Sequence, residues 1–138
     1  MAIDAGFGAI GFLAARVLFG GLLAFQGLNN FQNAETMTGY AQAKGVPAAR
    51  ANVLLSGGIL VFGGLGIVFG AFPAIAAGAV AIFLLVVTPM MHNFWAVPKD
   101  QQQAEMTNFI KNLELLGATV VFLALGSEPW AYALDIGL

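Results

Sequence analysis

The chain has 138 residues, of which 59% are hydrophobic and 9% are charged, against roughly 25% charged residues in an average soluble domain. This composition excludes an ordinary water-soluble domain, and the length allows one domain, residues 1–138, with a few membrane crossings of about 20 apolar residues each. The absence of cysteine excludes disulfide exchange and thiolate metal sites, and a net charge of −2 does not indicate a nucleic-acid partner.

The first apolar run covers residues 6–28 and predicts a membrane-spanning helix. No basic segment precedes it, and Arg16 interrupts it where the apolar region of a signal peptide would be unbroken. We therefore expect this segment to be retained in the mature protein.

A more polar segment, residues 34–44, follows the first apolar run. Its composition favours a helix, but it is too polar to cross a membrane, and Gly45 and Pro47 are typical of the residues that end a helix. A short helix at the membrane interface is the prediction for this segment.

The next apolar stretch is too long for a single crossing and is interrupted at Phe72 and Pro73. It therefore predicts a hairpin of two spanning helices, at about residues 49–70 and 73–95. After a polar connection, a last apolar run predicts a fourth spanning helix at about residues 109–127. The fold class expected is an all-α bundle of four transmembrane helices.

Positive charges in the connections indicate the orientation. Lys44 and Arg50 lie in the first connection, and Lys99 and Lys111 lie in or beside the third. By the positive-inside rule these connections face the cytoplasm and both termini face outward, in a multi-pass protein of the cell membrane. Small residues that allow close helix packing in lipid are dense in the predicted hairpin. They are Gly57, Gly58, Gly63, Gly64, Gly66 and Gly70, with Ala74, Ala76, Ala77, Gly78, Ala79 and Ala81 opposite.

The few polar groups at membrane depth are the candidates for function. Arg16 is the deepest of them, and because a charge there costs about 2.5 to 3.5 kcal/mol, we expect it to face the bundle and to pair with Glu114 or with carbonyls near Pro89. Thr88, His92 and Trp95 share one face of the third helix, and Pro89 removes a helical hydrogen bond beside them.

Together these side chains predict a polar ligand-binding pocket in the cytoplasmic half of the bundle. Its expected residues are Arg16, Gln26, Asn30, Tyr40, His92, Trp95, Lys111 and Glu114. The alternative is structural: ion pairs that hold the bundle together, with His92 and Trp95 as interfacial anchors. A haem bound through His92 is disfavoured because no axial partner on a facing helix is evident, and no metal site is expected.

The string His92-Asn93-Phe94-Trp95 and the later Lys111-Asn112-Leu113 resemble the His-x-Phe-Trp and Lys-Asn-Leu signatures of DoxX-family membrane proteins. The similarity extends from residue 16 to residue 125 and includes further matching positions: Arg16, Gly27, Gly45-Val46-Pro47, Ser56-Gly57 and Gly63-Gly64. Many members carry a lysine at the end of the first helix and a glutamate within the second, where this chain has Asn30 and Leu60. A mechanism that uses that glutamate is therefore not expected here.

The resemblance implies a membrane redox setting, since relatives are subunits associated with quinone-linked oxidation. One hypothesis is a protein that binds a membrane quinone, with Arg16 and His92 as hydrogen-bond donors, Phe94 and Trp95 as an apolar wall, and electrons exchanged with a redox partner protein. The other is a non-catalytic scaffold whose outer faces bind a partner or a second copy of the chain. Whether the protein is an enzyme stays open between the two.

Overall fold

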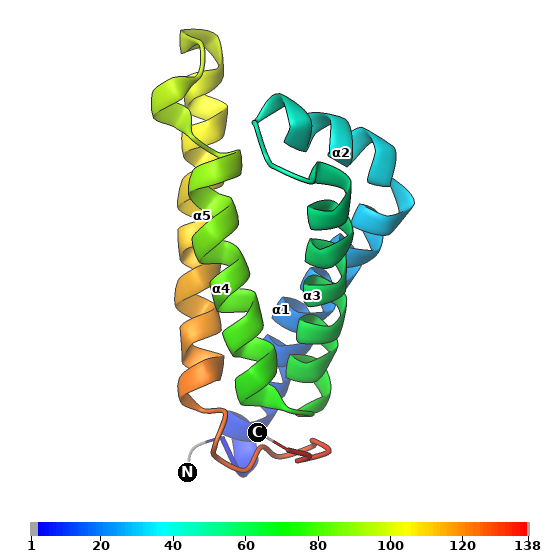
Figure 1. Ribbon diagram of the computed structural model, residues 1–138. Coiled ribbons are helices and arrows are strands. Elements are labelled where there is room, and N and C mark those ends of the chain that lie inside the picture. Colours follow the sequence, from blue (N-terminus) through cyan, green and yellow to red (C-terminus); the bar gives the residue numbers. More distant parts are fainter. Residues whose placement is uncertain (1–2, 138) are drawn as a thin grey trace.

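The computed structural model describes residues 3–137 as a bundle of helices (Figure 1). The elements in chain order are α1 (Gly6–Gln32), α2 (Ala34–Ala43), α3 (Ala49–Phe69), α4 (Pro73–Met91), the short 3₁₀ helix η1 (Phe94–Ala96) and α5 (Lys99–Ala124). The only β-structure among the described residues is one isolated bridge, between Ala71 and Ile136. The all-α prediction is confirmed.

Three expected boundaries differ from those of the structure. The helix expected at 73–95 ends as α4 at Met91, so His92 and Trp95 follow this helix and do not share its Thr88 face as predicted. The polar string after residue 28 continues α1 to Gln32 instead of ending it, and Asn33 alone separates α1 from α2. The last helix starts at Lys99, ten residues before the predicted start at 109, because the polar segment before Phe109 is helical and continuous with the apolar one. The short helix expected at 34–44 is found as α2.

Three helical segments of the described chain are long and apolar enough to cross a membrane: Gly6–Gln32, Ala49–Phe69 and Pro73–Ala96. Helix α5 is not among them, and its first sixteen residues carry five charged side chains. The chain therefore has membrane-protein character, but the count of four spans is not confirmed and stays a prediction. Large apolar side chains such as Phe7, Phe25 and Phe62 are exposed on the outer surface, as expected of helices in contact with lipid.

Glycines set the distance between α1 and α3. A methyl group at Gly27 would lie 2.6 Å from the carbonyl oxygen of Gly57, and one at Gly20 would meet the carbonyl oxygen of Gly64. The expected glycine contacts within the α3–α4 hairpin are also present, because Gly63 and Gly66 face α4. The stripe of small residues on α3 thus serves two neighbouring helices, where the sequence predicted one.

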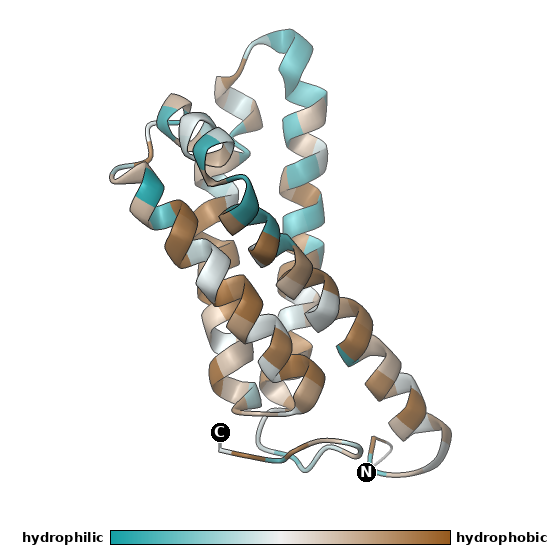
Figure 2. Cartoon of the chain, turned by 90° about the vertical axis from the view of Figure 1, so that its right-hand side faces the viewer, coloured by the Kyte–Doolittle hydropathy of each residue, from teal (hydrophilic) through white to brown (hydrophobic). Residues whose placement is uncertain are grey.

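Three apolar clusters follow one another along the bundle. The first lies at the end that carries both termini and includes Ile67, Phe122 and Trp130. The second is central and includes Leu60 and Val80. The third joins α2 to the start of α3 at the opposite end, which we call the loop end. Figure 2 shows that hydrophilic residues gather at this loop end, on α2 and the first turns of α5, whereas the rest of the bundle is mainly hydrophobic.

Candidate functional site: a partly buried polar cluster at the loop end

Five residues at the loop end form a polar cluster, which we call the loop-end cluster: Tyr40, Lys44, His92, Asn93 and Glu105. They come from three separate parts of the chain: the end of α2, the residues that follow α4, and the second turn of α5. Figure 1 shows why they meet: α2 lies across the loop end, with its last turn directed toward α4 and α5.

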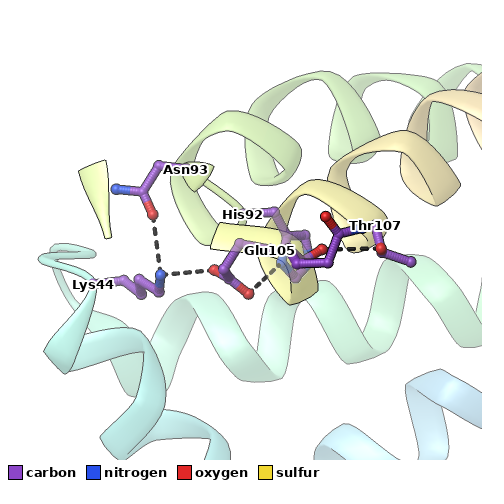
Figure 3. A network of polar contacts seen from close by, with 6 residues as sticks. Lys44, His92, Asn93, Glu105 and Thr107 are labelled. Carbon is purple, nitrogen blue, oxygen red and sulfur yellow. Dashed lines mark hydrogen bonds and ion pairs between the residues drawn. The ribbon is translucent and has the colours of Figure 1, made fainter. Parts of the chain in front are cut away.

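Lys44 and Glu105 are the centre of the cluster (Figure 3). The Nζ atom of Lys44 donates a hydrogen bond to Oε2 of Glu105 at 2.8 Å and another to Oδ1 of Asn93 at 3.0 Å. Only 13% of the Lys44 side chain and 9% of the Glu105 side chain are exposed. This ion pair is therefore largely shielded from solvent, and its two charges depend on each other for compensation.

His92 lies on the other side of the same carboxylate. Its Nδ1 atom is 3.5 Å from Oε1 of Glu105, a distance at which an ion pair forms when the imidazole is protonated. In the structure this Nδ1 atom is buried and makes no hydrogen bond. The backbone N–H of His92 caps α4 by donating to the carbonyl oxygen of Thr88. The imidazole thus lies against Glu105, and its Nδ1 atom has no hydrogen-bond partner.

Two buried threonine hydroxyls share this property, namely Oγ1 of Thr38 on α2 and Oγ1 of Thr88 on α4. Thr88 precedes Pro89, which has no N–H to donate to the carbonyl of Leu85. Buried polar groups are nearly always paired in folded proteins, with water where no protein group is available. Two of these three atoms, in Thr88 and His92, belong to the last turn of α4 and its cap.

The charges of the cluster shift the acid–base behaviour of its members. Burial by itself would raise the pKa of Glu105, but the hydrogen bond and positive charge of Lys44, with a smaller contribution from His92, bring it below its ordinary value. Burial raises the pKa of Tyr40, and the nearby carboxylate of Glu105 raises it further. At neutral pH the cluster therefore combines an ionised carboxylate with a protonated phenol.

Aromatic rings border the cluster. Phe94 and Trp95 of η1 and Phe109 of α5 form a trio of edge-to-face contacts, with ring centroids 5.2 to 5.9 Å apart. Trp95 is 58% exposed, so it lies on the outer surface next to the cluster, as an interfacial side chain does. The His-x-Phe-Trp string thus places a titratable ring and an exposed indole side by side.

Arg16 does not belong to this cluster, and the predicted pairing with Glu114 or with carbonyls near Pro89 is wrong. Its side chain is fully buried at the end that carries the termini, where it donates to carbonyl oxygens of Ile67 and Val68. Further bonds go to the carbonyl oxygens of Ala131 and Tyr132 in the C-terminal tail. Unpaired carbonyls at the end of α3, and not a carboxylate, are the partners of this charge, because the side chain is directed away from the loop end.

The other predicted site residues divide between the interior and the surface. Asn30 is buried and donates to the carbonyl oxygen of Val53, so it joins α1 to α3. Gln26, Lys111 and Glu114 are exposed on the outer faces of their helices. Of the eight predicted residues, the structure brings Tyr40 and His92 together in the cluster, with Trp95 at its border.

Sequence reasoning missed Lys44 and Glu105 as site residues. In the sequence, Lys44 indicates only the orientation in the membrane, and Glu105 lies in the polar connection before the helix expected at 109. A usable signal existed for Glu105: Thr119 and Phe122 are buried on α5, and Glu105 precedes Thr119 by two heptads, so the same helical face continues backward to it.

Two hollows lie elsewhere. An apolar groove of about 830 Å³ follows the outside of α3 and the start of α4, and a smaller one of about 300 Å³ lies beside the C-terminal tail. Neither is lined by the loop-end cluster. In the described part of the chain, no three His, Asp or Glu side chains are grouped as metal ligands would be.

The comparisons with curated proteins and with solved structures return no match. A family model does match: the DoxX model aligns with residues 11–93. The aligned part runs from α1 to the residue after His92 and so includes Tyr40, Lys44, His92 and Asn93, while Glu105 lies beyond it. Since this match covers more than half of the sequence, the chain belongs to the DoxX family.

Proposed function

We propose that the protein binds a membrane quinone and serves as a subunit of a redox complex, with the quinone head group at the loop-end cluster. The observation that carries this proposal is the buried Nδ1 atom of His92, which faces the Glu105 carboxylate at 3.5 Å without a hydrogen bond. A quinone head group needs hydrogen-bond partners and a route for protons in an otherwise apolar place. The cluster offers both.

The roles of the side chains follow from their arrangement. With Nδ1 directed at Glu105, Nε2 of His92 is the atom free to meet a ligand. A neutral imidazole would accept a hydrogen bond there from one quinol hydroxyl and would take up one of the two protons that a quinol releases on oxidation, while the second would pass to water at the loop end. Glu105 would stabilise the resulting imidazolium, while Lys44 keeps the carboxylate ionised. The two electrons pass to a redox-active partner protein.

The topology we propose has four spans, with α5 as the fourth. Helix α5 packs along α4, and Gly126, just beyond its end, touches Ala74 at the start of α4. If α4 crosses the bilayer, the second half of α5 lies at the same depth. Lys111 and Glu114 are then accommodated near the loop-end interface, where long side chains reach the head groups. Lys44, Arg50 and Lys99 all lie at the loop end, so we assign it to the cytoplasmic side.

Titration calorimetry with decylubiquinone, a short-tailed quinone, tests the proposal on the purified protein in detergent. We expect the wild type to bind it and His92→Ala to bind at least about tenfold more weakly, the loss of one good hydrogen bond. Glu114→Gln, on the exposed face of α5, is the matched control and should bind as the wild type does. Equal affinity of His92→Ala and wild type would reject the site.

The same cluster also favours a scaffold function, because Lys44 connects α2 to α5 and so holds distant parts of the chain together. A scaffold predicts that cluster variants lower thermal stability while no quinone analogue binds the wild type. Mass spectrometry of lipids that copurify with the protein separates the two functions. A quinone in the wild-type sample supports the first, and its absence together with no binding in calorimetry supports the second.

A further inference from the structure

We infer that α2 is a lid over the loop-end cluster, and that the Lys44–Glu105 ion pair is the latch that keeps it closed. The lid would control access to the proposed quinone site, and in that respect the inference rests on the proposed function. Its structural part, a short helix joined to α5 by a charged contact, stands independently of any ligand.

The connections on both sides of α2 suit a hinged element. Asn33 is the only residue between α1 and α2, and its φ of −118° and ψ of 34° are not helical. On the other side, Gly45 has a φ of 79° and Ala48 a φ of 47°, so two left-handed residues redirect the chain before α3. Breaks of this kind at both ends of a short helix are positions at which it can change direction relative to its neighbours.

The apolar contacts of α2 belong to one small cluster at the loop end. Ala41 is its single buried residue and packs with Ala49 and Val53 of α3, while Met37 of α2 and Met91 of α4 border the same cluster. An isolated ten-residue helix is marginal in water, so tertiary contacts must decide where α2 lies. The charged contact from Lys44 joins α2 to α5, whereas the apolar cluster joins α2 to α3 and to Met91 of α4.

The contacts of Lys44 and Glu105 define the closed position of α2. Lys44 is the C-cap residue of α2, and its ammonium group reaches both Asn93, just after α4, and Glu105 of α5. Glu105 is also faced by Tyr40 of the same lid and by His92 from the end of α4. Two lid residues thus converge on one carboxylate, and that carboxylate lies against the imidazole assigned to the ligand. Opening the lid would expose His92, and closing it would cover the bound head group.

The absence of cysteine makes a distance measurement direct. We would place spin labels at Gln42→Cys on α2 and Gln102→Cys on α5, both exposed positions, and measure their separation by pulsed electron paramagnetic resonance in lipid nanodiscs. A second pair, Ala51→Cys on α3 with Gln102→Cys, reports whether the bundle itself changes. The latch variants are Lys44→Met and Glu105→Gln, and Glu114→Gln is the control.

We expect one narrow distance between α2 and α5 in the wild type and in Glu114→Gln. Either latch variant should lengthen and broaden this distance while leaving the α3–α5 distance unchanged. The exchanged pair, Lys44→Glu with Glu105→Lys, should restore the narrow distribution. If both latch variants keep the wild-type α2–α5 distance, or if the α3–α5 distance changes equally, α2 is not a lid.

The association rate constant of a quinone tests whether the lid controls access to the site. With decylubiquinone, opening the latch by Lys44→Met should raise the association rate constant at least about threefold, because a closed lid limits binding to the fraction of open molecules. An unchanged rate constant with an opened lid would overturn the access function alone. If the wild type binds no quinone, the proposed function fails, while the distance measurements still decide the lid.

Discussion

The Nη2 atom of Arg16 lies 2.7 Å from the carbonyl oxygen of Val68, the penultimate residue of α3. The last carbonyls of a helix have no N–H partner within it, and they carry the negative end of its dipole. Arg16 supplies the missing donors from a neighbouring helix. A charge that is expensive at membrane depth is therefore compensated by helix-end carbonyls and by the tail folded over them.

Replacing Arg16 tests this capping role. Arg16→Met removes hydrogen bonds to four carbonyls, each worth about 1.5–3 kcal/mol when the donor is charged. The variant also avoids the cost of burying a charge in the membrane, about 2.5 to 3.5 kcal/mol, and this offsets part of the loss. We expect a net destabilisation of about 3 kcal/mol or more, measured as a lower midpoint of thermal unfolding in detergent.

Arg16→Lys separates charge from geometry, because an ammonium group cannot reach carbonyls in the fork arrangement of a guanidinium. It should also unfold at a lower temperature than the wild type. Since Arg16 lies at the opposite end from His92, both variants should keep the wild-type affinity for decylubiquinone. Full stability of Arg16→Met would contradict the capping role.

The sequence was sufficient to predict that Arg16 is buried, because depth and charge follow from hydropathy alone. It was not sufficient to identify the partners, since these are backbone carbonyls in Ile67, Val68 and a C-terminal tail that no periodic pattern describes. The helices could be predicted because apolar runs, and the glycine and proline residues that end them, are signals in the local sequence. The burial of Arg16 follows from the same local hydropathy.

The candidate site was predicted only in part. Tyr40, His92 and Trp95 were identified, while Glu114 and Lys111 were chosen in place of Glu105 and Lys44. Pairing across the bundle depends on the rotation of α5 about its axis and on the direction of α2. Both are set by packing, so spacing along one helix cannot reveal them.

The close contact between α1 and α3 can be tested with two neighbouring substitutions, Gly20→Ala and Gly21→Ala. A methyl group at Gly20 would lie 2.8 Å from Cγ2 of Val68 and would also meet the carbonyl oxygen of Gly64, whereas Gly21 has open space around it. Overpacking of this kind costs about 1–3 kcal/mol, so Gly20→Ala should lower the unfolding midpoint. Gly21→Ala should leave it unchanged or raise it slightly, as helix propensity favours alanine. Equal effects of the two substitutions would disprove the close contact.

Backbone strain before α3 predicts a stabilising change. Ala48 has a φ of 47°, and a left-handed conformation costs a non-glycine residue roughly 1–2 kcal/mol. Ala48→Gly should relieve this strain, for a net gain of about 0.5–1 kcal/mol after the greater chain entropy of glycine in the unfolded state. The mirror experiment is Gly45→Ala, at a φ of 79° with no neighbouring atoms, which should lose about 1 kcal/mol. Unfolding curves in which both substitutions change stability in the same direction would count against this account.

The Lys44–Glu105 ion pair makes part of the stability dependent on pH, and the sign follows from the pKa of Glu105. Lys44 holds this pKa below the ordinary value of about 4.5 that the residue has in the unfolded chain. The ionised carboxylate therefore stabilises the fold fully above that value, and the contribution is lost as the pH falls through the lowered pKa. We expect the difference in unfolding midpoint between wild type and Glu105→Gln to shrink as the pH falls from about 4.5 through the lowered pKa toward pH 3. Glu114→Gln, measured over the same range, provides the baseline for an exposed carboxylate on the same helix. A difference that stays constant to pH 3, or that grows in acid, would mean that Glu105 is not held ionised by Lys44, and the latch would then lack its charge.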